Sequence, residues 1–135
     1  MIKKIDHIGI LVRDLESSLS RYTSHLGIEV KEIEEVEVEN ASNRLAFLPV
    51  GETNVELIQT TAESGLLGDF LKERGEGIHH IAFEVEDIER SFQQLRSKGV
   101  EFVWDRIITG AHGSRVAFFK PHEFNGVYIE LVQRH

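Results

Sequence analysis

Hydrophobic and polar positions follow a pattern that occurs twice along this chain. Residues 5–12 form an apolar run rich in Ile and Val, which is typical of a buried strand. Asp14, a good helix N-cap, opens a segment with apolar residues at helical spacing, and Gly27 closes it. The buried stripe of that helix is expected to be Leu15, Leu19, Tyr22 and Leu26. Three further strands are expected at 28–37, 43–48 and 54–59.

The second half of the chain repeats this order. A strand is expected at 78–85, followed by a helix that Asp87 caps and Gly99 ends. The buried stripe of this helix is expected to be Ile88, Phe92 and Leu95. The remaining elements are expected as strands at 100–107, 114–119 and 126–133, and as turns at 49–54 and 121–126. Each half is therefore predicted to fold in the order β-α-β-β-β.

The two halves are predicted to form a single domain. One β-α-β-β-β half cannot cover both faces of its small sheet, so the two copies must associate. The expected organisation is a first module at 1–62, a connecting helix and linker at 63–76, and a second module at 77–135.

The composition is that of an ordinary globular protein of 135 residues, 41% of them hydrophobic and 28% charged. No apolar run approaches the length of a membrane span, and the chain starts in a strand pattern, not in a signal peptide. With no cysteine there can be no disulfide framework and no thiolate zinc site. We therefore expect a cytoplasmic protein whose metal ligands, if any, are His and carboxylates.

The net charge of −8 argues against nucleic acid or an anionic membrane as a partner, but it does not exclude an anionic small ligand. Many of the acids lie between residues 29 and 39. The preferred interpretation of this segment is a solvated, strongly twisted strand pair, and the alternative is a patch that collects metal ions.

A His and a Glu recur at matching places in the two halves. His7 and His80 are 73 residues apart, and Glu56 and Glu130 are 74 residues apart. Taken alone, each His would be read as a hydrogen-bonded core or surface residue, and each Glu as part of a solvated strand face. Both Glu are flanked by apolar residues, however, and a carboxylate is costly to bury without a proton, a cation or hydrogen bonds.

The repetition favours a metal site. If the halves close around a pseudo-twofold axis, two imidazoles and two carboxylates converge, and this ligand set suits Co²⁺, Zn²⁺, Mn²⁺ or Ni²⁺. Gly9 and Ala82 share strand faces with the two His and leave room for a ligand. Four protein ligands on a six-coordinate ion leave two positions for an oxygen chelate. His79 is expected on the opposite face from its neighbour His80.

A glycine-bracketed loop at 109–115 precedes one of the strands. It is either a simple turn or a site where backbone N–H groups, Ser114 and Arg115 meet an anionic substrate, with His112 beside them. The remaining residues of this kind are interpreted as surface residues, namely His25, Lys120, His122 and His135.

These residues resemble the vicinal oxygen chelate (glyoxalase/bleomycin resistance) superfamily, and within it the methylmalonyl-CoA epimerases. The superfamily resemblance rests on Asp6-His7-Ile8-Gly9-Ile10, Glu56-Leu57, Gly77-Ile78-His79-His80-Ile81-Ala82-Phe83-Glu84-Val85 and Glu130-Leu131-Val132-Gln133. The epimerase resemblance rests on Ile108-Thr109-Gly110-Ala111-His112-Gly113, followed by Val116-Ala117-Phe118-Phe119 and Pro121. Together these segments span practically the whole chain.

This resemblance implies an α+β fold in which two β-α-β-β-β modules form an open mixed barrel, and it implies a homodimer. It also implies one divalent metal ion per chain, with His7, Glu56, His80 and Glu130 as ligands. The implied reaction is epimerisation at C2 of an acyl-CoA substrate, methylmalonyl-CoA, through a metal-stabilised enolate.

Epimerisation needs a base on each face of the planar enolate, and Glu130 is the candidate for one of them. Members of the family are thought to place another Glu in the strand that matches 43–48. That strand has no acid here, and the preceding segment lacks the Glu-Gln-Gly run common in epimerases. Glu37, Glu39 or a metal-bound water are the alternatives for the second base, and the residues Asn43 and Arg44 equally indicate another substrate.

Two other functions compete with the epimerase. One is a glyoxalase-type isomerase or a lyase that acts on a small 2-oxo substrate, because the same four ligands and open positions would serve it. The other is a non-catalytic module that binds a planar ligand on aromatic side chains. The retained His and Glu residues, and the presence of only one Trp and two Tyr, rank this binding module below the enzymes.

Overall fold

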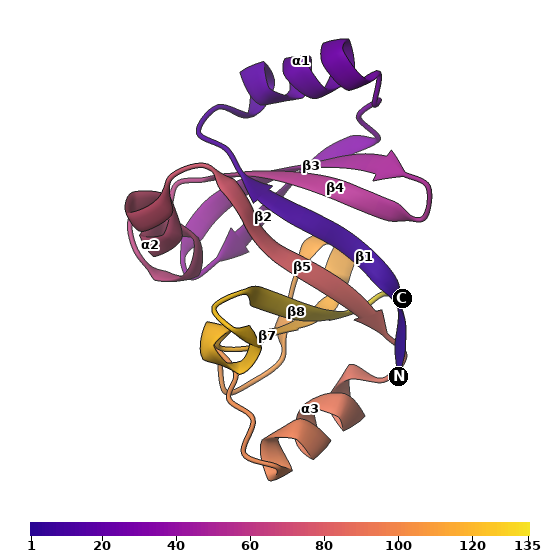
Figure 1. The fold of residues 1–135 in the computed structure, drawn as a ribbon, viewed down its shortest axis with the longest axis vertical. Helices are drawn as coiled ribbons and strands as arrows, with labels where there is room; N and C mark the ends of the chain where they lie inside the picture. Colours follow the sequence, from indigo (N-terminus) through magenta and orange to yellow (C-terminus); the bar gives the residue numbers. More distant parts are fainter. The chain divides into compact units, whose positions relative to one another are not determined.

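The computed structural model describes residues 1–135 and contains eight strands and three α-helices (Figure 1). The first half comprises β1 (Ile2–Leu11), α1 (Leu15–Leu26), β2 (Glu32–Val38), β3 (Ala41–Val50), β4 (Thr53–Thr60) and α2 (Gly65–Arg74). The second comprises β5 (Gly77–Val85), α3 (Ile88–Ser97), β6 (Ile108–Thr109), β7 (Arg115–Phe118) and β8 (Tyr128–Gln133). Short 3₁₀ helices occupy Ala111–Gly113 and Pro121–Phe124. No helix combines the length and the apolar character needed to cross a membrane.

The chain forms two compact units. One consists of His7–His79, and the other of Met1–Asp6 together with His80–His135. The boundaries between the units fall inside β1 and β5, a few residues into each strand. The α+β class and the order β-α-β-β-β in each half are confirmed.

In the unit His7–His79 the strands lie in the order β2-β3-β4-β1. β2, β3 and β4 pair antiparallel, and β1 runs parallel to β4. Helix α1 packs on one face of this sheet (Figure 1). The core between them consists of Val12, Leu15, Ala46, Leu48 and Leu57. The opposite face is the one that carries His7 and Glu56.

In the unit that contains His80–His135 the strands lie in the order β5-β8-β7-β6. β5 runs parallel to β8, and β8, β7 and β6 pair antiparallel, so the pairing repeats that of the first unit. Helix α3 covers one face of this sheet. The core beneath α3 consists of Val85, Ile88, Phe92, Phe102, Ala117, Phe119, Ile129 and Leu131.

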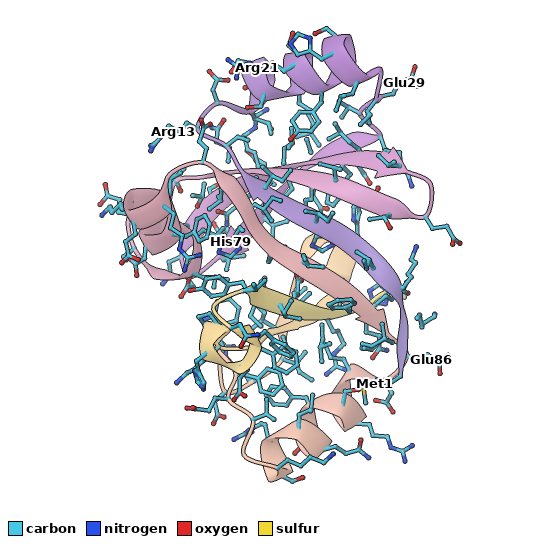
Figure 2. The ribbon with its side chains drawn as sticks, viewed as in Figure 1. Met1, Arg13, Arg21, Glu29, His79 and Glu86 are labelled. Atoms are coloured by element: carbon cyan, nitrogen blue, oxygen red, sulfur yellow. The ribbon has the colours of Figure 1, made fainter.

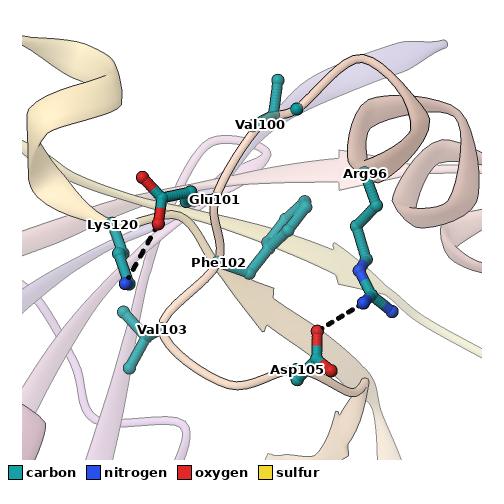
Figure 3. A pocket seen from close by; sticks show the side chains of 8 residues that line it. Arg96, Val100, Glu101, Phe102, Val103, Asp105 and Lys120 are labelled. Atoms are coloured by element: carbon teal, nitrogen blue, oxygen red, sulfur yellow. Dashed lines mark hydrogen bonds and ion pairs between the residues drawn. The ribbon is translucent and has the colours of Figure 1, made fainter.

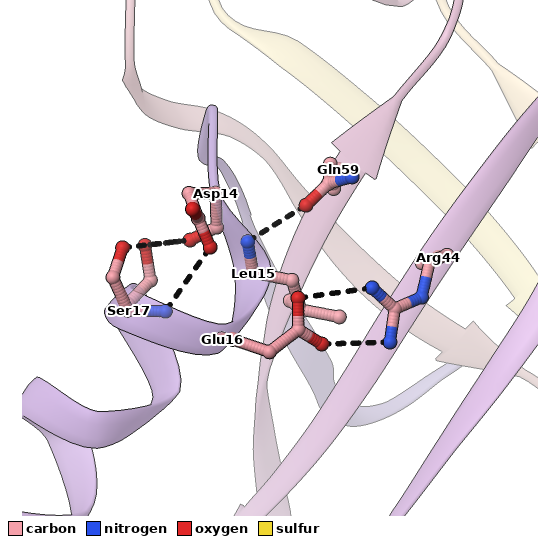
Figure 4. A network of polar contacts seen from close by, with 7 residues as sticks. Asp14, Leu15, Glu16, Ser17, Arg44 and Gln59 are labelled. Carbon is pink, nitrogen blue, oxygen red and sulfur yellow. Dashed lines mark hydrogen bonds and ion pairs between the residues drawn. The ribbon is translucent and has the colours of Figure 1, made fainter.

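The two helices α1 and α3 begin in the same way. The side chain of Asp14 accepts a hydrogen bond from the N–H of Ser17, as Figure 4 shows, and Asp87 does the same for Arg90. Both Asp residues are thus N-caps, as expected. Gly27 ends α1 in the left-handed conformation with φ of 68°, which a residue with a side chain rarely adopts.

Two expected elements are corrected. No strand runs through 100–107, since only Phe102 forms a β-bridge, to Phe119, and β6 contains two residues. Phe102 is buried in the core of this unit while the polar pair Asp105 and Arg106 is exposed, which interrupts the alternation that a strand needs. The strand expected at 28–37 begins only at Glu32.

The buried stripe of α1 is shorter than expected. Leu15 is fully buried, and Leu19 and Tyr22 pack against the core, but Leu26 is 64% exposed. Ile28, just after the helix, packs against the core in its place. The last turn of α1 therefore contributes little to the core of its unit.

The acidic segment forms a hairpin of β2 and β3, as its preferred interpretation predicted. Its two turn residues, Glu39 and Asn40, both have positive φ, of 53° and 62°, as a tight hairpin turn requires. The carboxylate of Glu39 accepts a hydrogen bond of 2.9 Å from the N–H of Leu66 in the first turn of α2. Since Ser64 makes no side-chain cap there, Glu39 supplies the acceptor and the negative charge that a helix N-terminus favours.

Candidate metal and substrate site

The first His–Glu pair lies on the sheet face of the unit His7–His79 that α1 does not cover. His7 comes from β1 and Glu56 from β4, and they are 3% and 5% exposed. The Nε2 atom of His7 is 3.5 Å from a carboxylate oxygen of Glu56. Gly9 is the register partner of Glu56, so no side chain from β1 stands directly opposite this carboxylate.

The second pair repeats this geometry in the other unit. His80 comes from β5 and Glu130 from β8, and they are also 3% and 5% exposed. The Nε2 atom of His80 is 3.1 Å from a carboxylate oxygen of Glu130. Ala82 is the register partner of Glu130, as Gly9 is of Glu56. Each repeat thus supplies one imidazole and one carboxylate on equivalent strands.

The chemistry of these donors fits a divalent cation. A carboxylate held against an imidazole and out of water is stabilised when a proton lies between the two groups or when a cation binds both. Nitrogen and oxygen donors of this kind suit first-row divalent ions, and the chain has no cysteine to offer instead. Each pair can supply two ligands to such an ion.

An aromatic residue stands beside each Glu. Phe47 is the antiparallel partner of Glu56, and Phe118 is the antiparallel partner of Glu130. The ring of Phe118 also meets the ring of His80 edge-on, with centroids 5.1 Å apart. Sequence reasoning overlooked these two Phe residues, although strand parity places them on the same face as the His and Glu.

His79 is buried on the opposite side of β5 from its neighbour, as the pleat predicts. Its Nε2 atom is 3.1 Å from the carbonyl oxygen of Leu66, and its ring meets that of Phe70 at 4.8 Å. Both partners belong to α2, next to which Figure 2 labels His79. These contacts fix the position of α2 beside His79, and they account for the burial of the His79 side chain.

The loop at 109–115 holds its three candidate residues in different environments. His112 is exposed and has a φ of 58°, whereas Ser114 is 2% exposed. A side chain at Gly110 would lie 3.0 Å from the Ser114 hydroxyl oxygen, so glycine permits this close approach. Arg115 forms an ion pair with Glu89 of α3. A substrate role for His112, Ser114 and Arg115 therefore stays a prediction.

Arg115 has a counterpart in the first repeat. Arg44 is the register partner of Gln59, and Arg115 is the register partner of Gln133. Arg44 binds both carboxylate oxygens of Glu16, at 3.1 and 2.8 Å, as Figure 4 shows. This contact lowers the pKa of Glu16 below its ordinary value, mainly through the hydrogen bonds from Arg44. In both repeats an ion pair of the arginine, Arg44 or Arg115, therefore links a strand to the first turn of the helix in that repeat.

Glu37 and Glu39 of the hairpin of β2 and β3 were two of the three alternatives for the second base, beside a metal-bound water. Glu37 lies opposite Ser42 in register, on the α1 side of the sheet and away from Glu56. Glu39 is engaged with α2, as described above. Asn43 is fully buried, and its side-chain amide donates hydrogen bonds to the carbonyl oxygens of Val36 and Ala41. The side chain therefore stabilises the hairpin.

The surface residues lie where they were expected, because His25, Lys120, His122 and His135 are all exposed. Lys120 borders a pocket of about 470 Å³ beside the end of α3, shown in Figure 3. The four charged residues of this pocket form two ion pairs, Arg96 with Asp105 at 2.6 Å and Lys120 with Glu101 at 3.3 Å. Neither His80 nor Glu130 lines it.

Comparison with known proteins identifies the family of this chain. The profile of the Glyoxalase/Bleomycin resistance protein/Dioxygenase superfamily matches residues 6–118. The chain belongs to this superfamily. The superfamily resemblance expected from the repeated His and Glu is thereby confirmed.

Within the superfamily the chain is similar to epimerases. It is 34% identical over 135 residues to the ethylmalonyl-CoA/methylmalonyl-CoA epimerase of Cereibacter sphaeroides, with 98% of this chain and 99% of the relative covered. It is 31% identical over 131 residues to the human mitochondrial methylmalonyl-CoA epimerase, with 96% and 73% covered.

A solved structure shows the same relationship. The methylmalonyl-CoA epimerase of Streptomyces coelicolor, in complex with 2-nitronate-propionyl-CoA, matches with a TM-score of 0.89 and 35% identity, covering 98% of this chain and 95% of that one. This match confirms the glyoxalase-like fold. Together with the two relatives it also confirms the expected likeness to an epimerase-type isomerase.

Proposed function

We propose that this protein is a metal-dependent epimerase that interconverts the C2 epimers of methylmalonyl-CoA. The observation that carries the proposal is the buried His–Glu pair that recurs on equivalent strands of the two repeats. The proposed substrate is supported by the relatives named as methylmalonyl-CoA epimerases, whose matches span nearly all of this chain.

His7, Glu56, His80 and Glu130 would hold one divalent ion, of the kind represented by Co²⁺, Zn²⁺, Mn²⁺ or Ni²⁺. When bound, the ion would fix the thioester carbonyl and carboxylate oxygens of the substrate and stabilise the negative charge of the enolate. The glycine and alanine opposite the two carboxylates leave space for that chelate.

Glu130 is the proposed base at C2. Its carboxylate is buried, and Phe118 stands opposite it in the strand pair, so water has little access to it. A carboxylate that is shielded from water in this way is a better proton acceptor than an exposed one. One carboxylate oxygen of Glu130 lies beside Nε2 of His80, where both would be ligands of the ion, and the other oxygen is left to accept the proton.

The second proton transfer has no assigned carboxylate in the hairpin of β2 and β3. Glu37 faces the α1 side and Glu39 caps α2, so neither is held toward the face of Glu56. Removal of the C2 proton needs only Glu130, whereas inversion also needs a proton donor on the other face. Exchange and inversion must therefore be measured separately.

The test uses full-length protein loaded with Co²⁺ and a single epimer of methylmalonyl-CoA in D₂O. We expect deuterium to enter at C2 and the other epimer to accumulate. Glu130→Gln should slow the exchange by about 100-fold or more, as expected for loss of a general base. Glu86→Gln is the control, because Glu86 is exposed and should leave the rate unchanged (Figure 2).

Two results would contradict the proposal. Protein that binds the metal stoichiometrically but gives no exchange would exclude the epimerase while leaving the metal site intact. Full activity of Glu130→Gln would exclude Glu130 as the base.

A glyoxalase-type isomerase is the second candidate, and the missing second carboxylate favours it. Such a reaction moves a proton between neighbouring carbons, which one base such as Glu130 can accomplish. A panel of thiohemiacetals of 2-oxoaldehydes, assayed beside methylmalonyl-CoA with the same metal-loaded sample, distinguishes the two reactions.

The assembly is proposed to be a cytoplasmic homodimer, as the superfamily resemblance implies. Light scattering of the purified protein tests its mass, and cell fractionation tests its location. A monomeric mass at micromolar concentration would exclude the dimer.

A further inference from the structure

A row of three aromatic rings leads away from Glu130 in the unit that contains His80–His135. His80 contacts Glu130, and the ring of Phe118 meets the ring of His80 at 5.1 Å and 84°. The ring of Trp104 in turn meets the ring of Phe118 at 5.8 Å and 86°. Both contacts have the edge-to-face geometry that aromatic pairs favour. Trp104 is thus the outer end of a row of ring contacts that starts beside the proposed base.

Exposure increases along this row. His80 and Phe118 are buried, with 3% and 7% of their surface exposed, whereas Trp104 is only partly buried. A large apolar side chain that remains partly open to water beside buried polar residues is typical of a ligand-binding surface. The part of Trp104 left open can therefore contact a bound molecule.

Comparison of the repeats shows that the fold does not require an aromatic residue at this place. The N–H of Val103 binds the carbonyl oxygen of Phe118 at 2.7 Å, and the N–H of Lys31 binds that of Phe47 at 2.8 Å. The residue after Lys31 is Glu32, which pairs with Phe47 and is exposed. The position that Trp104 occupies in the second repeat is thus filled by an exposed acid in the first.

We propose that Trp104, backed by Phe118, is the apolar wall against which the C2 substituent of the acyl group lies, and that it limits the length of that substituent. The inference deepens the proposed function and rests on it. In the proposed complex the metal held by the His and Glu residues would bind the oxygens of the acyl group and the C2 proton would face Glu130, so the alkyl group is the part left for an apolar surface. On the strand pair β7–β8 that surface is Phe118, continued by Trp104.

The first experiment compares methylmalonyl-CoA with ethylmalonyl-CoA, which differ by one methylene group at C2. A methylene group in an apolar pocket changes kcat/KM by about 10-fold to 200-fold. Trp104→Ala should therefore raise the ratio of kcat/KM for the ethyl over the methyl substrate by about tenfold. Trp104→Phe, which keeps an aromatic ring, should stay close to the ratio of the unchanged protein.

Phe124→Ala is the matched control for loss of an aromatic ring in the same unit. Phe124 is 41% exposed and packs on Phe119, on the α3 side of the sheet. It should leave the substrate ratio unchanged. The thermal unfolding of each variant shows whether its folded state is intact.

The second experiment uses the fluorescence of Trp104, which is the only Trp of the chain. The probe is 2-nitronate-propionyl-CoA, the molecule bound in the Streptomyces coelicolor structure. Adding it to the metal-loaded protein should shift the emission in a saturable way and should reduce quenching by acrylamide, because the bound acyl group covers the indole.

The outcomes distinguish a failure of the proposal for Trp104 from a failure of the proposed function. If the unchanged protein fails to exchange the C2 proton, the proposed function fails. If it exchanges the proton but Trp104→Ala lowers kcat/KM equally for both substrates, Trp104 contacts a part that the two share, and the wall proposal is overturned. Binding of the probe without any change in Trp104 emission overturns it as well.

Discussion

Gln59 and Leu15 are joined by a hydrogen bond of 2.7 Å, in which the side-chain oxygen of the strand residue accepts from the first N–H of α1 (Figure 4). Gln133 and Ile88 repeat the contact at 2.8 Å in the second unit. The first N–H groups of a helix have no partner within the helix itself. In each repeat a glutamine of the closing strand therefore fixes where its helix begins on the sheet.

Removing one of these glutamines should destabilise its repeat. Gln133→Ala leaves the N–H of Ile88 without its acceptor, and we expect a loss of about 1 kcal/mol in the free energy of unfolding. Gln133→Glu keeps an acceptor oxygen and places a negative charge at the helix N-terminus, so it should recover most of this loss. Urea denaturation measures both variants, and equal stability of Gln133→Ala and the unchanged protein would contradict the prediction.

The pair of Glu16 and Arg44 predicts a pH dependence. Hydrogen bonds from Arg44 lower the pKa of Glu16 in the folded protein. The stabilisation that this lowered pKa represents is therefore present above the unfolded pKa and is lost as the pH falls through the folded pKa. An NMR titration of the Glu16 carboxyl carbon should show its pKa rising in Arg44→Ala, whereas Arg21→Ala, a change on the exposed side of α1, should leave it in place.

Metal binding should stabilise the protein through both repeats. An ion at about 100 times its dissociation constant adds about 2.7 kcal/mol to the free energy of unfolding, and EDTA should remove this gain. His80→Ala and His7→Ala should each lose most of the metal-dependent rise in Tm. His25→Ala, a change at an exposed residue of α1, should keep it. If His80→Ala binds one ion per chain as tightly as the unchanged protein, the proposed ligand set is wrong.

Asp6 and Arg134 form an ion pair in which the carboxylate is buried and the guanidinium is partly exposed. Two hydrogen bonds of 3.1 and 2.5 Å join them, and Asp6 is 3% exposed. Arg134→Ala leaves a buried carboxylate without its guanidinium, which should cost about 3 kcal/mol in the free energy of unfolding. The double variant Asp6→Asn with Arg134→Ala should recover a part of this loss, because the buried charge is gone.

The control for this ion pair is Arg96→Ala. Its partner Asp105 is 84% exposed, and the guanidinium also lies over the ring of Phe92, so the change should cost about 1 kcal/mol. Chemical denaturation of all four proteins completes the comparison. A loss of stability in Arg134→Ala no larger than that in Arg96→Ala would show that burial does not matter to the Asp6 pair.

Much of the fold followed from the sequence because its apolar runs, helix caps and turn residues recur in the same order in both halves. The pleat of β1 places His7 on the same face as Gly9, and the apolar neighbours of Glu56 distinguish it from a carboxylate on a solvated strand face. The N-caps Asp14 and Asp87 could also be predicted, because a helix N-cap is a local feature of the sequence. These features depend only on neighbouring residues.

The features that sequence reasoning overlooked depend on contacts between distant residues. The roles of Gln59 and Gln133 require the register of a strand against a helix start, and the role of Glu39 requires the position of α2. Segment 100–107 reads as a strand by composition, yet Phe102 turns into the core and the chain then bends. The contact of Trp104 with Phe118 forms at that bend, so it could not be predicted from the hydrophobic periodicity of the sequence.

Strand β1 contributes Met1–Asp6 to the same compact unit as the second repeat and continues from His7 into the other. A fragment that starts at Gly77 would therefore lack the carboxylate that Asp6 offers to Arg134. Splitting the gene at the repeat junction should yield an insoluble half. A circular permutation that joins the first six residues to the C-terminal end through a short tether offers the better route to a free-standing half-protein.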